Sequence, residues 1–147
     1  MMDRLGIRFS AWALLCMVMM ASCGKNVCKV PIGDARCEIN LLNPDAYNLN
    51  HAGGMVKAYG GNMGLWIVNT GLEYAVYEAT CPHCGNVATD TISGWEGLLQ
   101  CRVCESRFST YSDGYPLNGS VSECPLYRYS CVQEGYSLHI YNYCIAL

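Results

Sequence analysis

Two pairs of closely spaced cysteines are the part of this sequence best suited to chemistry. The first pair lies in "TCPHCG", which holds Cys81, His83 and Cys84, and the second lies in "CRVCESRFS", which holds Cys101 and Cys104. Thiolates at this spacing bind Zn²⁺ or iron, and a Cys-x-x-Cys pair can also exchange disulfides. The pattern therefore raises three alternatives: a zinc site, an iron–sulfur cluster and a redox-active dithiol.

The segment after the first pair bears on the dithiol. Catalytic dithiols lie at the start of a helix, whose dipole lowers the pKa of the attacking thiol. After Cys84 the chain reads "GNVATDTISGWEG", in which glycines, threonines and other β-branched residues disfavour a helix. Thiol–disulfide exchange by Cys81 and Cys84 is therefore the least favoured alternative.

The spacing of the cysteine motifs resembles the Rieske iron–sulfur domains, which carry Cys-x-His, a gap of this size and then Cys-x-x-His. Further segments are similar to that family, namely "CESRFS", "SDGYPLNGS" and "PLYRYSCVQEGYSLHIY". The resemblance implies a small antiparallel β-sandwich with a two-loop metal-binding subdomain over residues 48–147. It also implies that Ser106 donates a hydrogen bond to a cluster sulfur, and that electrons pass to or from a partner in the cell envelope.

The ligand set departs from that family at one position. The resemblance carries ligand roles onto Cys81, His83 and Cys101, but Cys104 stands where the family has a second histidine. Three cysteines with His83 would suit a 2Fe-2S cluster, whereas four cysteines, with Cys84 in place of His83, would suit Zn²⁺. Disulfides without any metal are a third outcome, and the residues alone do not choose among the three.

The start of the chain resembles a bacterial lipoprotein signal. A weakly basic beginning leads into an apolar run that ends "MASCG", so residues 1–22 would be cleaved and Cys23 acylated. The apolar run is shorter than the roughly 20 residues that span a bilayer. Residues 23–47 would then form a tether and first strand of a membrane-anchored envelope protein. The signal has no twin arginine, so the chain would cross the membrane unfolded and without a cluster, which favours zinc or disulfides.

Short strands are the elements expected to position these cysteines. Runs rich in β-branched and aromatic residues lie at Met55 to Tyr59, Leu65 to Val68 and Tyr74 to Ala79, and the first two are bounded by Gly or Asn. "CEINLLN" predicts an earlier strand, and the last segment predicts a hairpin. No helical periodicity appears between them, so the fold class is expected to be all-β.

The expected hairpin also predicts a disulfide. If it turns through three residues, Gln133 to Gly135, then Cys124 lies opposite Cys144 at a distance that a disulfide can bridge. Cys28 and Cys37 form a second possible pair.

Charge and motif content exclude several functions. Nine basic residues stand against twelve acidic ones, with no run of either sign, so nucleic acid is not an expected partner. The sequence has no phosphate loop, no nucleophile with a base and no paired carboxylates in an apolar setting. It is therefore not expected to be an enzyme in its own right; the expected partner is an envelope redox or interaction protein.

Overall fold

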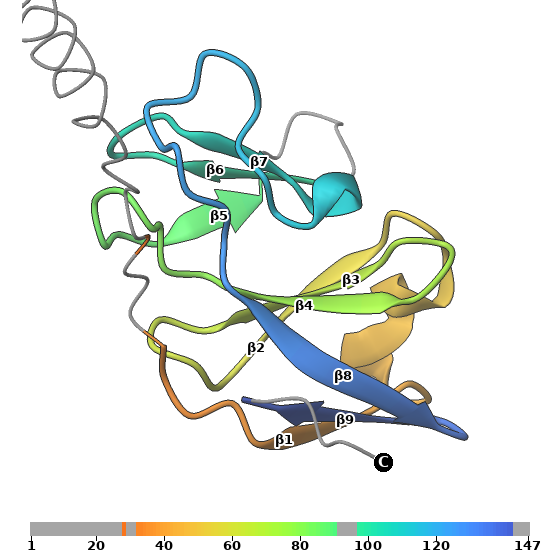
Figure 1. Ribbon diagram of the computed structural model, residues 1–147. Coiled ribbons are helices and arrows are strands. Elements are labelled where there is room, and N and C mark those ends of the chain that lie inside the picture. Colours follow the sequence, from red (N-terminus) through yellow and green to blue (C-terminus); the bar gives the residue numbers. More distant parts are fainter. Residues whose placement is uncertain (1–27, 29–31, 91–96, 143–147) are drawn as a thin grey trace, which may run out of the picture.

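The computed structural model describes Cys28 and residues 32–90 and 97–142. Among these residues no helix is long and apolar enough to cross a membrane. The elements are strands joined by turns and two 3₁₀ helices (Figure 1), in the order β1 Cys37–Asn40, η1 Pro44–Asn50, β2 Met55–Ala58, β3 Leu65–Asn69, β4 Tyr74–Glu78, β5 Ala88–Asp90, β6 Leu98–Cys101, β7 Arg107–Ser109, η2 Thr110–Ser112, β8 Arg128–Glu134 and β9 Ser137–Tyr141. The prediction of an all-β fold is confirmed.

Six of the strands form one curled antiparallel sheet in the order β1-β9-β8-β4-β3-β2. Its two ends approach each other where Asp34, just before β1, bridges to Gly61 in the β2–β3 turn. The curled sheet encloses a core that includes Ile67, Val76 and Leu138, and η1 adds Leu49 to it.

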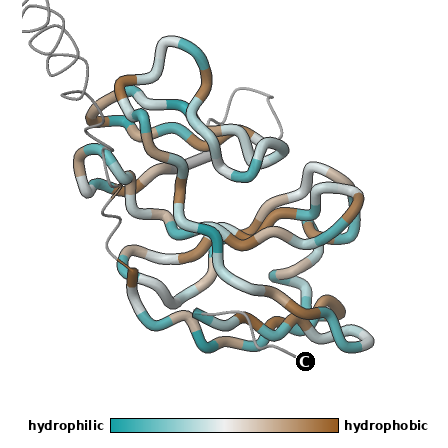
Figure 2. Tube along the Cα trace, in the orientation of Figure 1, coloured by the Kyte–Doolittle hydropathy of each residue, from teal (hydrophilic) through white to brown (hydrophobic). Residues whose placement is uncertain are grey.

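The other three strands form a small sheet in the order β5-β6-β7, which packs on the outer face of β3 and β4. Alternate residues of β4 therefore face two cores: Val76 the inner one and Tyr77 the outer one. This double coverage buries every residue of β4 except Tyr74, and Figure 2 shows brown, apolar residues along β3. The Trp66 indole donates to the Ala88 carbonyl at 2.9 Å and fixes the small sheet in place.

The last hairpin corrects the expected disulfide. Glu134 pairs with Ser137, so the turn has two residues with Gly135 first, at φ 60°, rather than three. This shifts the register, and Cys124 lies outside the paired strands. Cys124 instead forms a disulfide with Cys28, with a Cα–Cα distance of 5.7 Å.

The other cysteines with a predicted disulfide or lipid are Cys37, Cys144 and Cys23. Cys37 is not in a disulfide, so the alternative pair Cys28–Cys37 is wrong as well. Cys144 and the proposed lipid attachment residue, Cys23, lie outside the described residues.

A buried carboxylate joins the large sheet to the first cysteine loop. Glu78, at the end of β4, is fully buried and accepts hydrogen bonds from the amides of Asn62 and Met63, at 2.7 and 3.1 Å. The Tyr129 hydroxyl donates at 2.7 Å, and Thr80 donates from its amide and its hydroxyl at 3.0 and 2.8 Å. Burial by itself raises the pKa of this carboxyl, but these hydrogen bonds outweigh it and the pKa is lowered.

Glu78→Gln is expected to lower the free energy of unfolding by about 2–3 kcal/mol at neutral pH, because the carboxamide nitrogen replaces one carboxylate oxygen and sets its N–H groups against the donors that this oxygen accepted. The native-state pKa of Glu78 is below its ordinary value of 4.5, so the stabilisation is complete above that value and is lost as pH falls through the lower native value. Urea unfolding between pH 3 and pH 7 measures this, with the exposed Glu38→Gln as control. An unchanged difference between wild type and Glu78→Gln across that range would contradict it.

Candidate metal centre

The two cysteine pairs lie in loops at one edge of the small sheet. The first loop leaves β4 and is closed by a bridge between Thr80 and Val87, and the second joins β6 to β7. Each loop begins with a buried cysteine at the end of a strand or bridge, Cys81 in the first loop and Cys101 in the second. Within five residues the chain turns back to lie beside that cysteine. Strand pairing between β5 and β6 sets Ala88 opposite Cys101 and so holds the two loops side by side.

The two loops have the same backbone construction. The Cys81 amide donates to the Asn86 carbonyl at 2.6 Å, and the Cys101 amide donates to the Ser106 carbonyl at 2.9 Å. Inside each loop, the amides two and three residues further on donate to the sulfur of the first cysteine. Burial raises the pKa of both first cysteines, and these amide–sulfur bonds partly oppose it by stabilising the thiolate.

Both loops also need a left-handed residue directly after their second cysteine. Gly85 has φ 73° in the first loop, and Glu105 has φ 59° in the second. Glycine adopts this conformation without strain, but a residue with a Cβ does not. The second loop therefore tolerates a strained residue to keep the same shape as the first.

Glu105→Gly is expected to raise the free energy of unfolding by about 1 kcal/mol, since it removes this strain and an exposed side chain. The matched control is Gly85→Ala. A Cβ there would meet no atom within 4 Å, so only the backbone strain is tested and about 1 kcal/mol should be lost. Chemical denaturation measures the free energy of unfolding of both variants. Changes of the same sign in the two variants would contradict the backbone strain assigned to Glu105.

Four sulfur atoms converge between the loops. The ligand atoms of Cys81, Cys84, Cys101 and Cys104 all lie within 4.8 Å of one another. The nearest approaches are between loops, at 3.3 Å from Cys84 to Cys101 and 3.6 Å from Cys81 to Cys104. A tetrahedron of thiolates around one ion with metal–sulfur bonds of 2.3 Å has edges of about 3.8 Å. The cluster is close to that size.

His83 is not part of this group. Its side chain is exposed, while Cys84 on the same loop reaches the other three sulfurs. Of the two ligand sets left open by the sequence, the described residues therefore assemble the one with four cysteines. None of the four is in a disulfide.

The site has a buried side and an open side. Cys81 and Cys101 are fully buried against the outer core, whereas Cys84 and Cys104 are partly exposed. Burial raises the pKa of Cys81 to about 12 despite its amide hydrogen bonds. Burial opposes ionisation of Cys84 too, but the side chain and backbone of Asn86, with the neighbouring thiols, lower its pKa to about 6. A bound cation would supply the charge that the buried thiolates lack.

Two polar side chains flank the outer sulfurs. The buried Ser106 hydroxyl lies 3.3 Å from the Cys104 sulfur, in the place that the sequence predicted for it. Its oxygen accepts the Cys104 thiol and the Ser122 amide, the latter at 2.9 Å, and its own proton could turn to the sulfur once Cys104 is ionised. The Asn86 amide group, which the sequence analysis did not identify, lies 3.5 Å from the Cys84 sulfur. Both would orient the ligands of a bound metal.

No protein-family model matches the chain, and no curated protein sequence matches it. The geometry of the site therefore carries the functional argument.

Proposed function

We propose that this protein is an exported domain whose small sheet is held together by one Zn²⁺ ion bound to four cysteines, and that it serves as a structural or interaction module. The observation that carries the proposal is the convergence of four sulfurs within 4.8 Å. Zn²⁺ favours four thiolates in a tetrahedron, and a site with four protein ligands leaves no position open for substrate. Such a site stabilises a fold rather than catalysing a reaction.

The same distance favours a single ion over a 2Fe-2S cluster. In that cluster the four ligands are divided between two irons, which sulfide ions join. Thiolates on different irons therefore lie further apart than thiolates bound to one ion. Sulfurs that all lie within 4.8 Å suit one ion better. We therefore favour a structural zinc site over electron transfer through a 2Fe-2S cluster. We also propose that the two loops are arranged as in the Rieske family but carry a different set of ligands.

The size of the small sheet supports a structural role for the metal. Its strands have three, four and three residues, too few to hold the two cysteine loops by pairing alone. Metal binding to such a site contributes directly to folding. Without it, four thiols at 3.3–3.6 Å in an oxidising compartment would be exposed to disulfide formation.

We propose the cell envelope as the location, with the lipid attached at Cys23. The disulfide between Cys28 and Cys124 supports this, because structural disulfides persist outside the cytoplasm. The signal-like start of the chain supports it independently. The partner would then be another envelope protein.

The test is the metal content and visible spectrum of the mature protein purified from its own membrane fraction. We expect one zinc per chain and no visible absorption. Two irons per chain with the absorption of an iron–sulfur cluster would overturn the zinc proposal in favour of electron transfer. Absence of metal together with loss of all four thiols would show a disulfide-bonded site instead.

A further inference from the structure

We infer that the Cys28–Cys124 disulfide turns the metal-bearing end of the domain toward the lipid surface that holds Cys23. The inference rests on the lipid attachment proposed above and adds an orientation to it. It follows from where the chain leaves the folded domain and from how much chain remains to reach the membrane.

Without the disulfide, the tether would leave from the large sheet. The Asp34 carbonyl accepts the Gly61 amide at 2.8 Å, and the Ala35 amide donates to the side chain of Asn142, so the chain is held from these residues onward. From Cys23 to Gly33 the chain could span up to about 35 Å. So long a tether would leave the domain free to present any face to the membrane.

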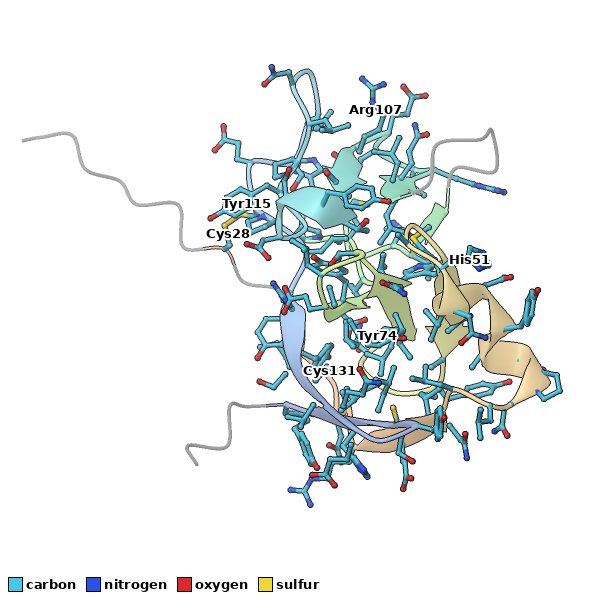
Figure 3. The ribbon with its side chains drawn as sticks, turned by 90° about the vertical axis from the view of Figure 1, so that its right-hand side faces the viewer. Cys28, His51, Tyr74, Arg107, Tyr115 and Cys131 are labelled. Carbon is cyan, nitrogen blue, oxygen red and sulfur yellow. A yellow bond between two sulfur atoms is a disulfide. The ribbon has the colours of Figure 1, made fainter. Side chains whose placement is uncertain are left out.

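The disulfide shortens the tether and moves its point of attachment. Cys28 follows Cys23 by five residues, which span at most about 18 Å. Its partner Cys124 comes two residues after Ser122, whose side chain accepts the Cys124 amide at 3.3 Å. Figure 3 shows Cys28 in the upper part of the molecule with the small sheet, and Cys131 in the large sheet below.

The attachment point at Cys124 lies close to the sulfur cluster. The Ser122 amide donates to the hydroxyl of Ser106, which in turn lies 3.3 Å from the Cys104 sulfur. The attachment point therefore lies on the order of 10 Å from the sulfur cluster, since two residues span at most about 7 Å. The tether leaves the domain beside the metal loops.

The loops of this end present apolar side chains to the outside. Val103 lies between the two cysteines of the second loop with 66 % of its surface exposed, and Val121 is 56 % exposed beside Ser122. Charges on the second loop are mixed, with Arg102 and Arg107 against Glu105, so the short tether rather than electrostatic attraction sets the orientation. Lipid headgroups are the surface that these loops face.

The opposite end is then the face open to partners in solution. It is formed by η1 and the β8–β9 turn, which lie across the molecule from the metal loops in Figure 1. Tyr47 and Tyr136 are exposed there, at 68 % and 65 %. Because Tyr136 is about as exposed as Val121, the two positions make a matched pair of probes.

The test uses the lipidated mature protein in vesicles of phosphatidylethanolamine and phosphatidylglycerol. A fluorescent unnatural amino acid is placed at position 121 or at position 136, and energy transfer to a headgroup-linked acceptor is measured. We expect transfer from position 121 to exceed transfer from position 136 by about twofold or more, because the tether is short beside position 121. The difference should disappear in a Cys28→Ser/Cys124→Ser variant and persist in Cys37→Ser.

Each outcome decides a separate claim. Equal transfer from both positions in the disulfide-bonded, vesicle-bound protein would overturn the orientation while leaving the anchor intact. Failure of the protein to float with the vesicles would overturn the anchor and the orientation together. The zinc content of the same samples reports on the metal proposal independently of both.

Discussion

Replacing Cys101 with serine is expected to abolish stoichiometric zinc binding and to lower the free energy of unfolding by about 4 kcal/mol or more. Cys101 is fully buried, ends β6 and lies 3.3 Å from the Cys84 sulfur, so serine leaves a buried hydroxyl in place of a ligand. Structural zinc sites contribute directly to folding, so weakened binding appears as lost stability. Denaturant unfolding with zinc present, combined with metal analysis, measures both effects.

A chelator provides the matching experiment. It should destabilise the wild type and have little further effect on Cys101→Ser, because the variant has already lost the metal. Cys37→Ser is the control, since Cys37 is a partly buried free thiol on β1, outside the sulfur cluster. A Cys101→Ser protein that retains one zinc per chain and unfolds like the wild type would contradict the four-cysteine site.

Loss of the disulfide is expected to cost roughly 4 kcal/mol, the second largest effect. The bridge joins residues separated by 96 positions, and closing so long a loop removes much of the entropy of the unfolded chain. The double variant Cys28→Ser/Cys124→Ser tests this without leaving an unpaired thiol. Urea unfolding should show a lower midpoint for it, while zinc content stays at one per chain.

Cys131→Ser is the control for this prediction, because Cys131 is a partly buried cysteine of β8 that forms no disulfide. Peptide mapping under non-reducing conditions should recover Cys28 linked to Cys124. A Cys124–Cys144 peptide would restore the pairing expected from the sequence. An unchanged unfolding midpoint in the double variant would show that the bridge does not constrain the fold.

Local patterns were enough to predict β2, β3 and β4 to within one residue at each end. All three are β-branched and aromatic runs, those of β2 and β3 are bounded by Gly or Asn, and both signals act over a few residues. The cysteine spacings likewise identified the two loops whose four sulfurs converge. Ser106 was placed beside a ligand sulfur because the resemblance covered its segment.

Features that depend on distant contacts were not predictable. Cys28 pairs across 96 positions, and no spacing rule selects such a partner. The hairpin turns at Gly135 and Tyr136 instead of at Gln133 to Gly135, which changes its register and removes the expected pairing of Cys124 with Cys144. The choice of Cys84 over His83 depends on two loops from different parts of the chain having the same backbone shape.

Glu78 is a further example. In the sequence it is one of several scattered acidic residues, with nothing to mark it as buried. Its burial depends on the β2–β3 turn, which supplies the amides of Asn62 and Met63, and on Tyr129 from β8. A carboxylate with this many donors is recognisable only once the curled sheet has brought these segments together.

X-ray absorption at the zinc edge of the purified mature protein tests the central claim most directly. The four-cysteine site predicts four sulfur neighbours at about 2.3 Å and no second metal nearby. A histidine nitrogen at about 2.0 Å would return His83 to the ligand set. A protein that carries iron in place of zinc, with a second iron close by, would contradict the single-ion site.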